Sequence, residues 1–184
     1  RRVLFVARTR YAWPVPSRKF DALREELDIR VLGTSADGSA HADATFTLVP
    51  RAPVADGLVF WLALPFRVAR LLRDFRPDGV VCQTAYEGAA TLLARSLARV
   101  SARVVVEVHG DWRTSTRLYG SSARRMLSGV ADAVAAFALQ RADAVRTVSP
   151  FTAGLVRDLG VEPAADFPAY MDLEPFARAP EPLP

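Results

Sequence analysis

The sequence has very few of the residues that form disulfides or bind metals. Cys82 is its one cysteine, so no disulfide can form within the chain, and we expect a cytoplasmic protein in a reducing compartment. The two histidines, His41 and His109, have no cysteine partner at zinc-ligand spacing, so no metal centre is expected. Long apolar runs are also missing. Residues 58–64 fall far short of the roughly 20 residues that a membrane-spanning helix needs.

Three motifs of well-known enzyme classes are absent. The first strand-to-helix turn has no G-x-G-x-x-G, and the chain has no G-x-x-x-x-G-K-[ST], which argues against dinucleotide and P-loop sites. A G-x-S-x-G elbow is missing too, which argues against an α/β-hydrolase. The net charge is +4 and the arginines are scattered, so no nucleic-acid-binding stripe is indicated. We expect neither a bound cofactor nor a nucleic-acid partner.

Short apolar runs alternate with amphipathic stretches along the chain. This alternation predicts an α/β protein with a doubly wound, mainly parallel Rossmann-like sheet and helices on both faces. Strands are expected at residues 3–7, 29–32, 45–49, 79–83, 103–108, 144–148 and 165–168, and helices at 18–27, 57–75, 89–100, 123–142 and 151–159. Pro65 predicts a kink in the second helix, or a helix that starts there.

The end of the chain suggests how it is organised into domains. Residues 1–176 are expected to form one Rossmann-like domain, and the proline-rich residues 177–184 an interdomain linker. Because the chain does not start with methionine and ends in this tail, we expect both ends to be cuts in a longer protein.

The valine-rich strand at residues 104–108 leads into the most informative residues. It stops at His109-Gly110-Asp111-Trp112, where the glycine allows a tight turn. Ligands of open α/β sheets bind at the carboxyl ends of the strands, and hydrogen-bonding groups beside an aromatic ring suit a sugar. The alternative is that His109 and Trp112 only pack in the core or against the loop.

Other segments are expected at the same edge of the sheet. Tyr86 and Glu87 lie in the loop after the strand at 79–83, although Glu87 could equally be a helix N-terminal charge. Ser149 opens the helix at 151–159, where its hydroxyl can cap the helix or help to bind an oxyanion. An irregular loop at residues 8–17 completes this edge.

Three segments resemble family-4 glycosyltransferases of the GT-B fold. They are the strand that ends in His-Gly-Asp (residues 104–111), the "ADAVxxVS" strand (141–149) and the P-x-x-x-D-x-x-x-F passage into the second domain (168–176). The resemblance runs over nearly the whole chain. It implies the N-terminal, acceptor-side half of a retaining enzyme that transfers a sugar from a nucleotide-sugar donor to a glycan or lipid-linked acceptor. The C-terminal, donor-binding domain would be its missing partner.

The resemblance also implies roles for single residues. His109 would be catalytic and hold the donor sugar while positive charge develops, and Asp111 would orient the loop or touch acceptor hydroxyls. The family's glycine pair in the first loop is missing here, so arginine or lysine would replace any diphosphate contact it makes. The expected substrate-binding residues are Gly110, Asp111, Trp112, Arg113, Tyr86, Glu87, Ser149, Thr152, Arg8, Arg10 and Lys19.

Two other functions fit the same pattern. One is a non-catalytic sugar- or partner-binding module, and the other is an inverting GT-B transferase with His109 as its base. The stretch at residues 60–75 also predicts a peripheral contact with the inner face of a membrane, because arginines stand beside Trp61 and Phe66. The alternative is that this helix packs on the sheet with its arginines in water.

Overall fold

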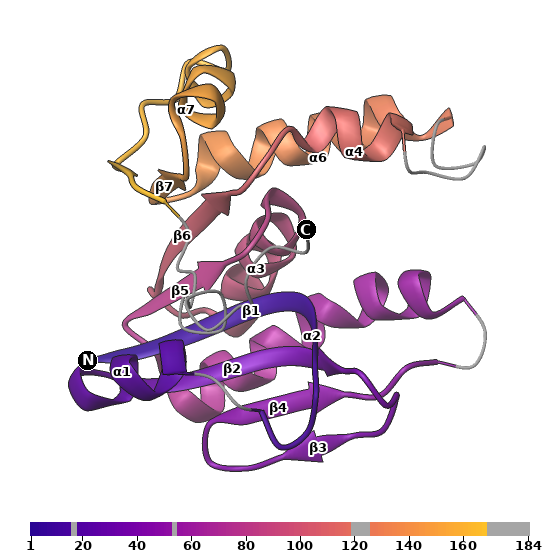
Figure 1. The fold of residues 1–184 in the computed structure, drawn as a ribbon, viewed down its shortest axis with the longest axis vertical. Coiled ribbons are helices and arrows are strands. Elements are labelled where there is room, and N and C mark those ends of the chain that lie inside the picture. The colour runs from indigo at the N-terminus through magenta and orange to yellow at the C-terminus, as the bar shows by residue number, and fades with distance from the viewer. Residues whose placement is uncertain (16–17, 53–54, 119–125, 169–184) are drawn as a thin grey trace, which may run out of the picture.

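A single mixed sheet forms the centre of the molecule. The computed structural model describes residues 1–15, 18–52, 55–118 and 126–168. Within these residues, eight strands are arranged in the order β3-β4-β2-β1-β5-β6-β7-β8 (Figure 1). The strands are β1 (Arg2–Tyr11), β2 (Asp28–Ser35), β3 (His41–Ala42), β4 (Phe46–Val49), β5 (Gly79–Cys82), β6 (Arg103–Val108), β7 (Ala144–Thr147) and β8 (Ala165–Asp166). All neighbours are parallel except the edge pair β3–β4.

Helices cover both faces of this sheet. They are α1 (Arg18–Glu26), α2 (Asp56–Phe75), α3 (Ala85–Ala98), α4 (Trp112–Leu118), α6 (Ser128–Arg141) and α7 (Pro150–Arg157). Helices α2, α3 and α6 pack side by side on one face, and α1 packs on the other (Figure 1). The predicted fold class, a doubly wound and mainly parallel α/β sheet, is confirmed.

Alternate side chains of the strands supply two separate cores. Leu4 and Val6 of β1 belong to the larger core with α2, α3 and α6, whereas Phe5 packs with Phe20 of α1 in the smaller one. Cys82 lies in the larger core, where it packs as a small apolar residue, and burial raises the pKa of its thiol to about 12.

Helix α2 runs without interruption through Pro65, so it does not start at that residue. A proline inside a helix removes one backbone hydrogen bond and costs about 3 kcal/mol. Burial of Phe60 and Leu64 in the N-terminal half offsets this cost, because each large apolar side chain contributes about 1.5–3 kcal/mol. Among the described residues, no helix is long and apolar enough to cross a bilayer.

Three boundaries at the functional edge differ from the prediction. Strand β1 continues to Tyr11, because Arg10 and Tyr11 pair with the end of β2 after a register shift. Helix α3 begins at Ala85, four residues earlier than expected, because the Thr84 hydroxyl accepts a hydrogen bond from the backbone N–H of Tyr86. Helix α4 forms directly after the His109–Asp111 turn, where no helix was predicted. The predicted domain boundary at 176 lies outside the described residues.

Candidate active site at the carboxyl edge of the sheet

The carboxyl ends of β1, β5, β6 and β7 bring the sequence-predicted segments to one edge of the sheet. Strand β1 has β2 on one side and β5 on the other, so the strand order reverses beside it. In parallel α/β sheets, such a reversal leaves a crevice at the carboxyl ends where ligands bind. The segment after β6 therefore lies one strand away from this position.

His109 stands directly after β6 and its side chain is 36% exposed, so it can reach a ligand. Its Nε2 lies 3.2 Å from Oε2 of Glu107, and the other carboxylate oxygen of Glu107 pairs with Arg146 of β7. Burial opposes ionisation of Glu107, but hydrogen bonds from His109 and Arg146, with the nearby positive charges, lower the pKa of this carboxyl. A carboxylate that holds a histidine ring fixes its orientation, as catalytic sites require.

Asp111 organises the loop after His109. Its carboxylate accepts hydrogen bonds from the backbone N–H of Arg113 (2.9 Å) and the hydroxyl of Thr114 (2.7 Å), and so caps the start of α4. Burial acts against ionisation, but these bonds outweigh it and lower the pKa of Asp111. Trp112 is buried in the larger core, with the Arg113 guanidinium 5.5 Å from its ring, whereas no side chain of the described residues would contact a Cβ on Gly110.

Glu87 is a buried carboxyl in the first turn of α3, only 2% exposed. Oε1 accepts the backbone N–H of Arg8 (3.1 Å) and Oε2 pairs with the Thr84 hydroxyl. Loss of hydration raises the pKa of Glu87, although these bonds act in the opposite direction. Glu87 therefore joins β1 to α3 from within the protein and is not in contact with the surface.

The Arg8 guanidinium lies close to two aromatic rings of α2. It lies 5.5 Å from the ring of Phe60 and 5.9 Å from that of Trp61, and its Nη2 lies 3.5 Å from the Asp56 carboxylate. Tyr86 packs edge-on against Trp61, with ring centroids 6.1 Å apart. A half-exposed arginine held in this way is available to an anionic group.

Ser149 and Thr152 cap α7. The Ser149 hydroxyl accepts the backbone N–H of Thr152 (3.3 Å), and the Thr152 hydroxyl accepts the backbone N–H of Ser149 (3.1 Å). Thr152 is buried, whereas Ser149 is partly exposed. The capping role that the sequence allowed for Ser149 is therefore present.

The remaining two predicted basic residues are on different elements, β1 and α1. Arg10 is exposed on β1, in register with Thr34 of β2. Lys19 lies on α1 with its ammonium 5.8 Å from the ring of Phe5, and its charge contributes to the lowered pKa of Glu107. Lys19 therefore belongs to the same face of the sheet as the Glu107–Arg146 pair.

Sequence reasoning missed Glu107 and Arg146. Both are charged residues within apolar strands, and they lie in the two strand motifs at residues 104–111 and 141–149. Such charges are rarely buried unless they are paired, and that is the signal that could have identified them. Their pairing partner could not be read from the sequence, because 39 residues separate them.

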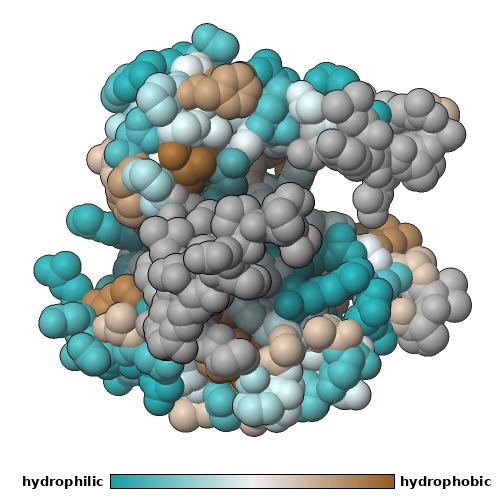
Figure 2. Space-filling view, in the orientation of Figure 1, coloured by the Kyte–Doolittle hydropathy of each residue, from teal (hydrophilic) through white to brown (hydrophobic). Residues whose placement is uncertain are grey.

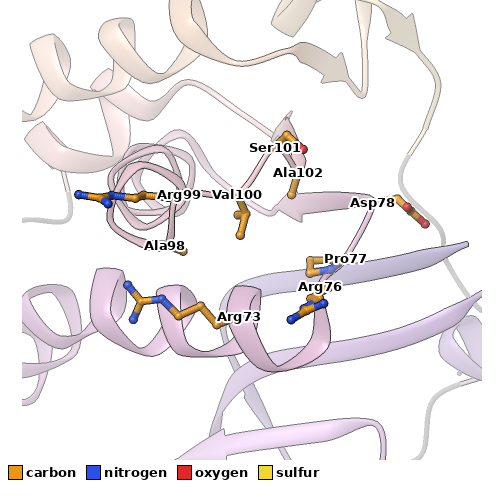
Figure 3. A pocket seen from close by; sticks show the side chains of 9 residues that line it. All are labelled: Arg73, Arg76, Pro77, Asp78, Ala98, Arg99, Val100, Ser101 and Ala102. Carbon is orange, nitrogen blue, oxygen red and sulfur yellow. The ribbon is translucent and has the colours of Figure 1, made fainter.

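A groove of about 850 Å³ lies at the opposite edge of the sheet, where α2 and α3 end (Figure 3). Arg76 and Arg99 line it as left-handed C-caps, with φ of 50° and 55°. In Figure 3 the guanidinium groups of Arg73, Arg76 and Arg99 do not converge on one point. The groove is remote from the carboxyl edge and is not part of the candidate site.

Comparison with protein families decides the classification. The model of the glycosyl transferase 4-like domain matches residues 12–165, which is most of the chain. The chain belongs to this family. The predicted relationship to family-4 GT-B glycosyltransferases is thereby confirmed. No curated protein matches the chain.

Solved structures share the fold of this glycosyl transferase 4-like domain. Sucrose-phosphate synthase from Thermosynechococcus elongatus matches with a TM-score of 0.65 and 10% identity, over 94% of this chain and 49% of its own. UGT89C1 from Arabidopsis thaliana, complexed with UDP, matches with a TM-score of 0.53 and 12% identity, over 92% of this chain and 48% of its own. UDP-N-acetylglucosamine 2-epimerase from Rickettsia bellii matches with a TM-score of 0.54 and 11% identity, over 91% of this chain and 44% of its own. The chain spans about half the length of these proteins.

Proposed function

We propose that this domain is the acceptor-side half of a retaining glycosyltransferase that uses a nucleotide-sugar donor. Its family and fold support a glycosyltransferase. The observation that carries the proposal is the exposed His109 side chain at the carboxyl end of β6, held by the Glu107 carboxylate. A second, donor-binding domain would close over this edge and complete the site.

His109 has the geometry to contact a donor sugar. Its exposed side chain stands at a strand end, and a Cβ added to the neighbouring Gly110 would meet no atom of the described residues within 4 Å. In the transition state of glycosyl transfer the sugar ring becomes oxocarbenium-like, and a positioned dipole beside it lowers the barrier. Asp111 keeps the loop in place, and Trp112 supports it from the core.

The Arg8 guanidinium is the group best placed to meet a phosphate. It is partly exposed at the strand-order reversal and lies against two aromatic rings, which limit its rotamers. Arg10 is a second, exposed cation on the same strand. In the proposal these two replace the glycine-rich backbone contact that the first loop lacks.

The acceptor is proposed to be lipid-linked, with the domain located in the cytoplasm against the inner membrane face. Three apolar residues on the outer stripe of α2 are exposed: Leu58 (61%), Leu62 (65%) and Phe66 (68%). The side chain of Arg70, one turn beyond, is 85% exposed. Phe66 thus points outward as docking requires, whereas Trp61 packs inward on Tyr86. Phe66 and Leu62 would enter the lipid surface while Arg70 meets its anionic headgroups.

A donor screen on the full-length protein tests the proposal. Wild type, His109→Ala and His41→Ala are compared for transfer from a panel of nucleotide sugars. His41 is a matched control, since it is also paired with a carboxylate (Asp37, 2.8 Å) but lies on the edge strand β3. We expect His109→Ala to lower kcat about a hundredfold or more, with stability within about 1 kcal/mol, and His41→Ala to keep wild-type turnover.

Two outcomes would contradict the proposal. Binding of a sugar without transfer from any donor would indicate a non-catalytic module. Unchanged turnover per folded His109→Ala molecule would remove His109 from the site. The anomeric configuration of the product, read by NMR, separates retaining from inverting transfer.

A further inference from the structure

Glu107 and Arg146 form the most buried ion pair among the described residues. They occupy paired positions on β6 and β7, and each side chain is only 12% exposed. Removing two charges from water costs about as much as their attraction returns, so a buried pair is a poor way to gain stability. The Nε of Arg146 is also buried and has no hydrogen-bond partner among the described residues. The pair is better explained by the positions that it fixes.

Arg146 holds the segment by which the chain leaves the sheet. Its Nη2 donates to the carbonyl oxygens of Phe167 (3.0 Å) and Pro168 (2.9 Å), directly after β8. The Phe167 ring stacks on the guanidinium, 3.8 Å from Cζ. A planar fork with several donors makes these contacts at once, which a lysine ammonium cannot do.

Glu107 carries the connection in the other direction. One carboxylate oxygen pairs with Arg146 and the other lies 3.2 Å from Nε2 of His109. A continuous series of polar contacts therefore runs from Phe167 and Pro168, through Arg146 and Glu107, to the His109 ring. It joins the last described strand to the proposed catalytic residue.

We propose that Arg146 is a positioning residue: through Glu107 it fixes the His109 side chain relative to the segment that leads to the second domain. The inference rests on the proposed function, in which His109 and the second domain must meet the same donor sugar. Displacement of a catalytic group by about 1 Å can cost about a hundredfold in rate, so a rigid connection here has a direct effect on turnover. Arg146 does not itself touch the substrate.

The test uses Arg146→Lys in the full-length enzyme. Lysine keeps the charge opposite Glu107 and so protects the fold, but it loses the fork and the ring stacking. We expect kcat to fall about tenfold or more, with KM for the donor changed less than about threefold. Arg141→Lys is the matched control, because Arg141 also lies over a phenylalanine ring (Phe137, 5.8 Å) but on the exposed end of α6. It should retain wild-type kcat.

A double variant separates positioning from a general structural role. In a His109→Ala background, Arg146→Lys should cause no further loss of kcat, because it acts through His109. Wild-type kcat in Arg146→Lys, or losses that multiply in the double variant, would overturn the inference. If the wild-type enzyme transfers no sugar at all, the proposed function fails instead. In that case the positioning role is tested by pulsed EPR, which measures the distribution of distances between the two domains. Arg146→Lys should broaden this distribution, and an unchanged width would overturn the positioning role.

Discussion

Gly88 of α3 lies directly against Val106 of β6: a Cβ on Gly88 would stand 2.6 Å from Cγ2 of the valine. This close approach packs α3, the helix that carries Glu87, against the strand that precedes His109. Gly88→Ala should therefore lower the free energy of unfolding by about 1–2 kcal/mol, because Val106 or the helix has to move. Urea denaturation of the chain measures this loss.

Gly154 provides the opposite case for comparison. It lies within α7, and a Cβ there would meet no atom of the described residues within 4 Å. Gly154→Ala should raise the free energy of unfolding by about 0.5–1 kcal/mol, since alanine favours a helix and restricts the unfolded chain. A stabilised Gly88→Ala, or equal effects of the two substitutions, would show that α3 does not pack as closely as described.

Glu107 should make folding depend on an ionised carboxylate. Its pKa in the folded state is lowered, so the stabilisation is present above the ordinary glutamate pKa of about 4.3 and is lost as the pH falls through the lower folded value. Glu107→Gln should cost about 2 kcal/mol or more at pH 7, and less at pH 3. The free energies of unfolding at both pH values test the sign. A difference that does not change with pH would mean that Glu107 is not ionised in the fold.

Glu87 should show the opposite pH dependence. Burial raises its pKa, so its contribution is fully present below pH 4.3 and is lost as the pH rises through the raised folded value. Relative to wild type, Glu87→Gln should become more stable between pH 4 and pH 8, because glutamine resembles the protonated acid. The same urea series measures this trend. A variant that loses stability relative to wild type over this range would indicate a charged Glu87.

The isolated chain should fold cooperatively but transfer no sugar. Its sheet is covered by packed helices on both faces and has a large buried core, whereas the domain proposed to bind the donor is absent. Coincident urea transitions by circular dichroism and tryptophan fluorescence would support this expectation. Measurable turnover by residues 1–184 alone would exclude the proposed two-domain site.

Flotation with liposomes tests the proposed membrane contact. The wild-type protein should float with anionic vesicles at low salt and less with neutral ones, because both apolar and cationic groups of α2 take part. Leu62→Ser with Phe66→Ser should abolish flotation, and so should Arg67, Arg70 and Arg73 replaced by Ala. Val130→Ser, which alters an exposed apolar residue on α6, is the control. Binding that ignores lipid charge and these substitutions would refute the contact.

A contact surface is difficult to recognise from sequence, because exposed apolar residues are scattered over the molecule. On the described part of the face in Figure 2, apolar residues form separate small areas among hydrophilic ones. The α2 stripe contains similar residues, but only the packing of Phe60 and Leu64 on the sheet shows that Phe66 must point outward. Helical spacing alone left both orientations open.

The sequence by itself determined the fold class and the position of His109. Both depend on local signals: a run of valines that favours a buried strand, a glycine that ends it, and the alternation of strands and helices. Only the tertiary structure decided which charged residues are buried and what holds them. Glu87 meets the backbone of Arg8, and Glu107 meets Arg146, across 79 and 39 residues of chain. Such pairs depend on strand order and register, which arise from the packing of distant segments, and no local pattern records them.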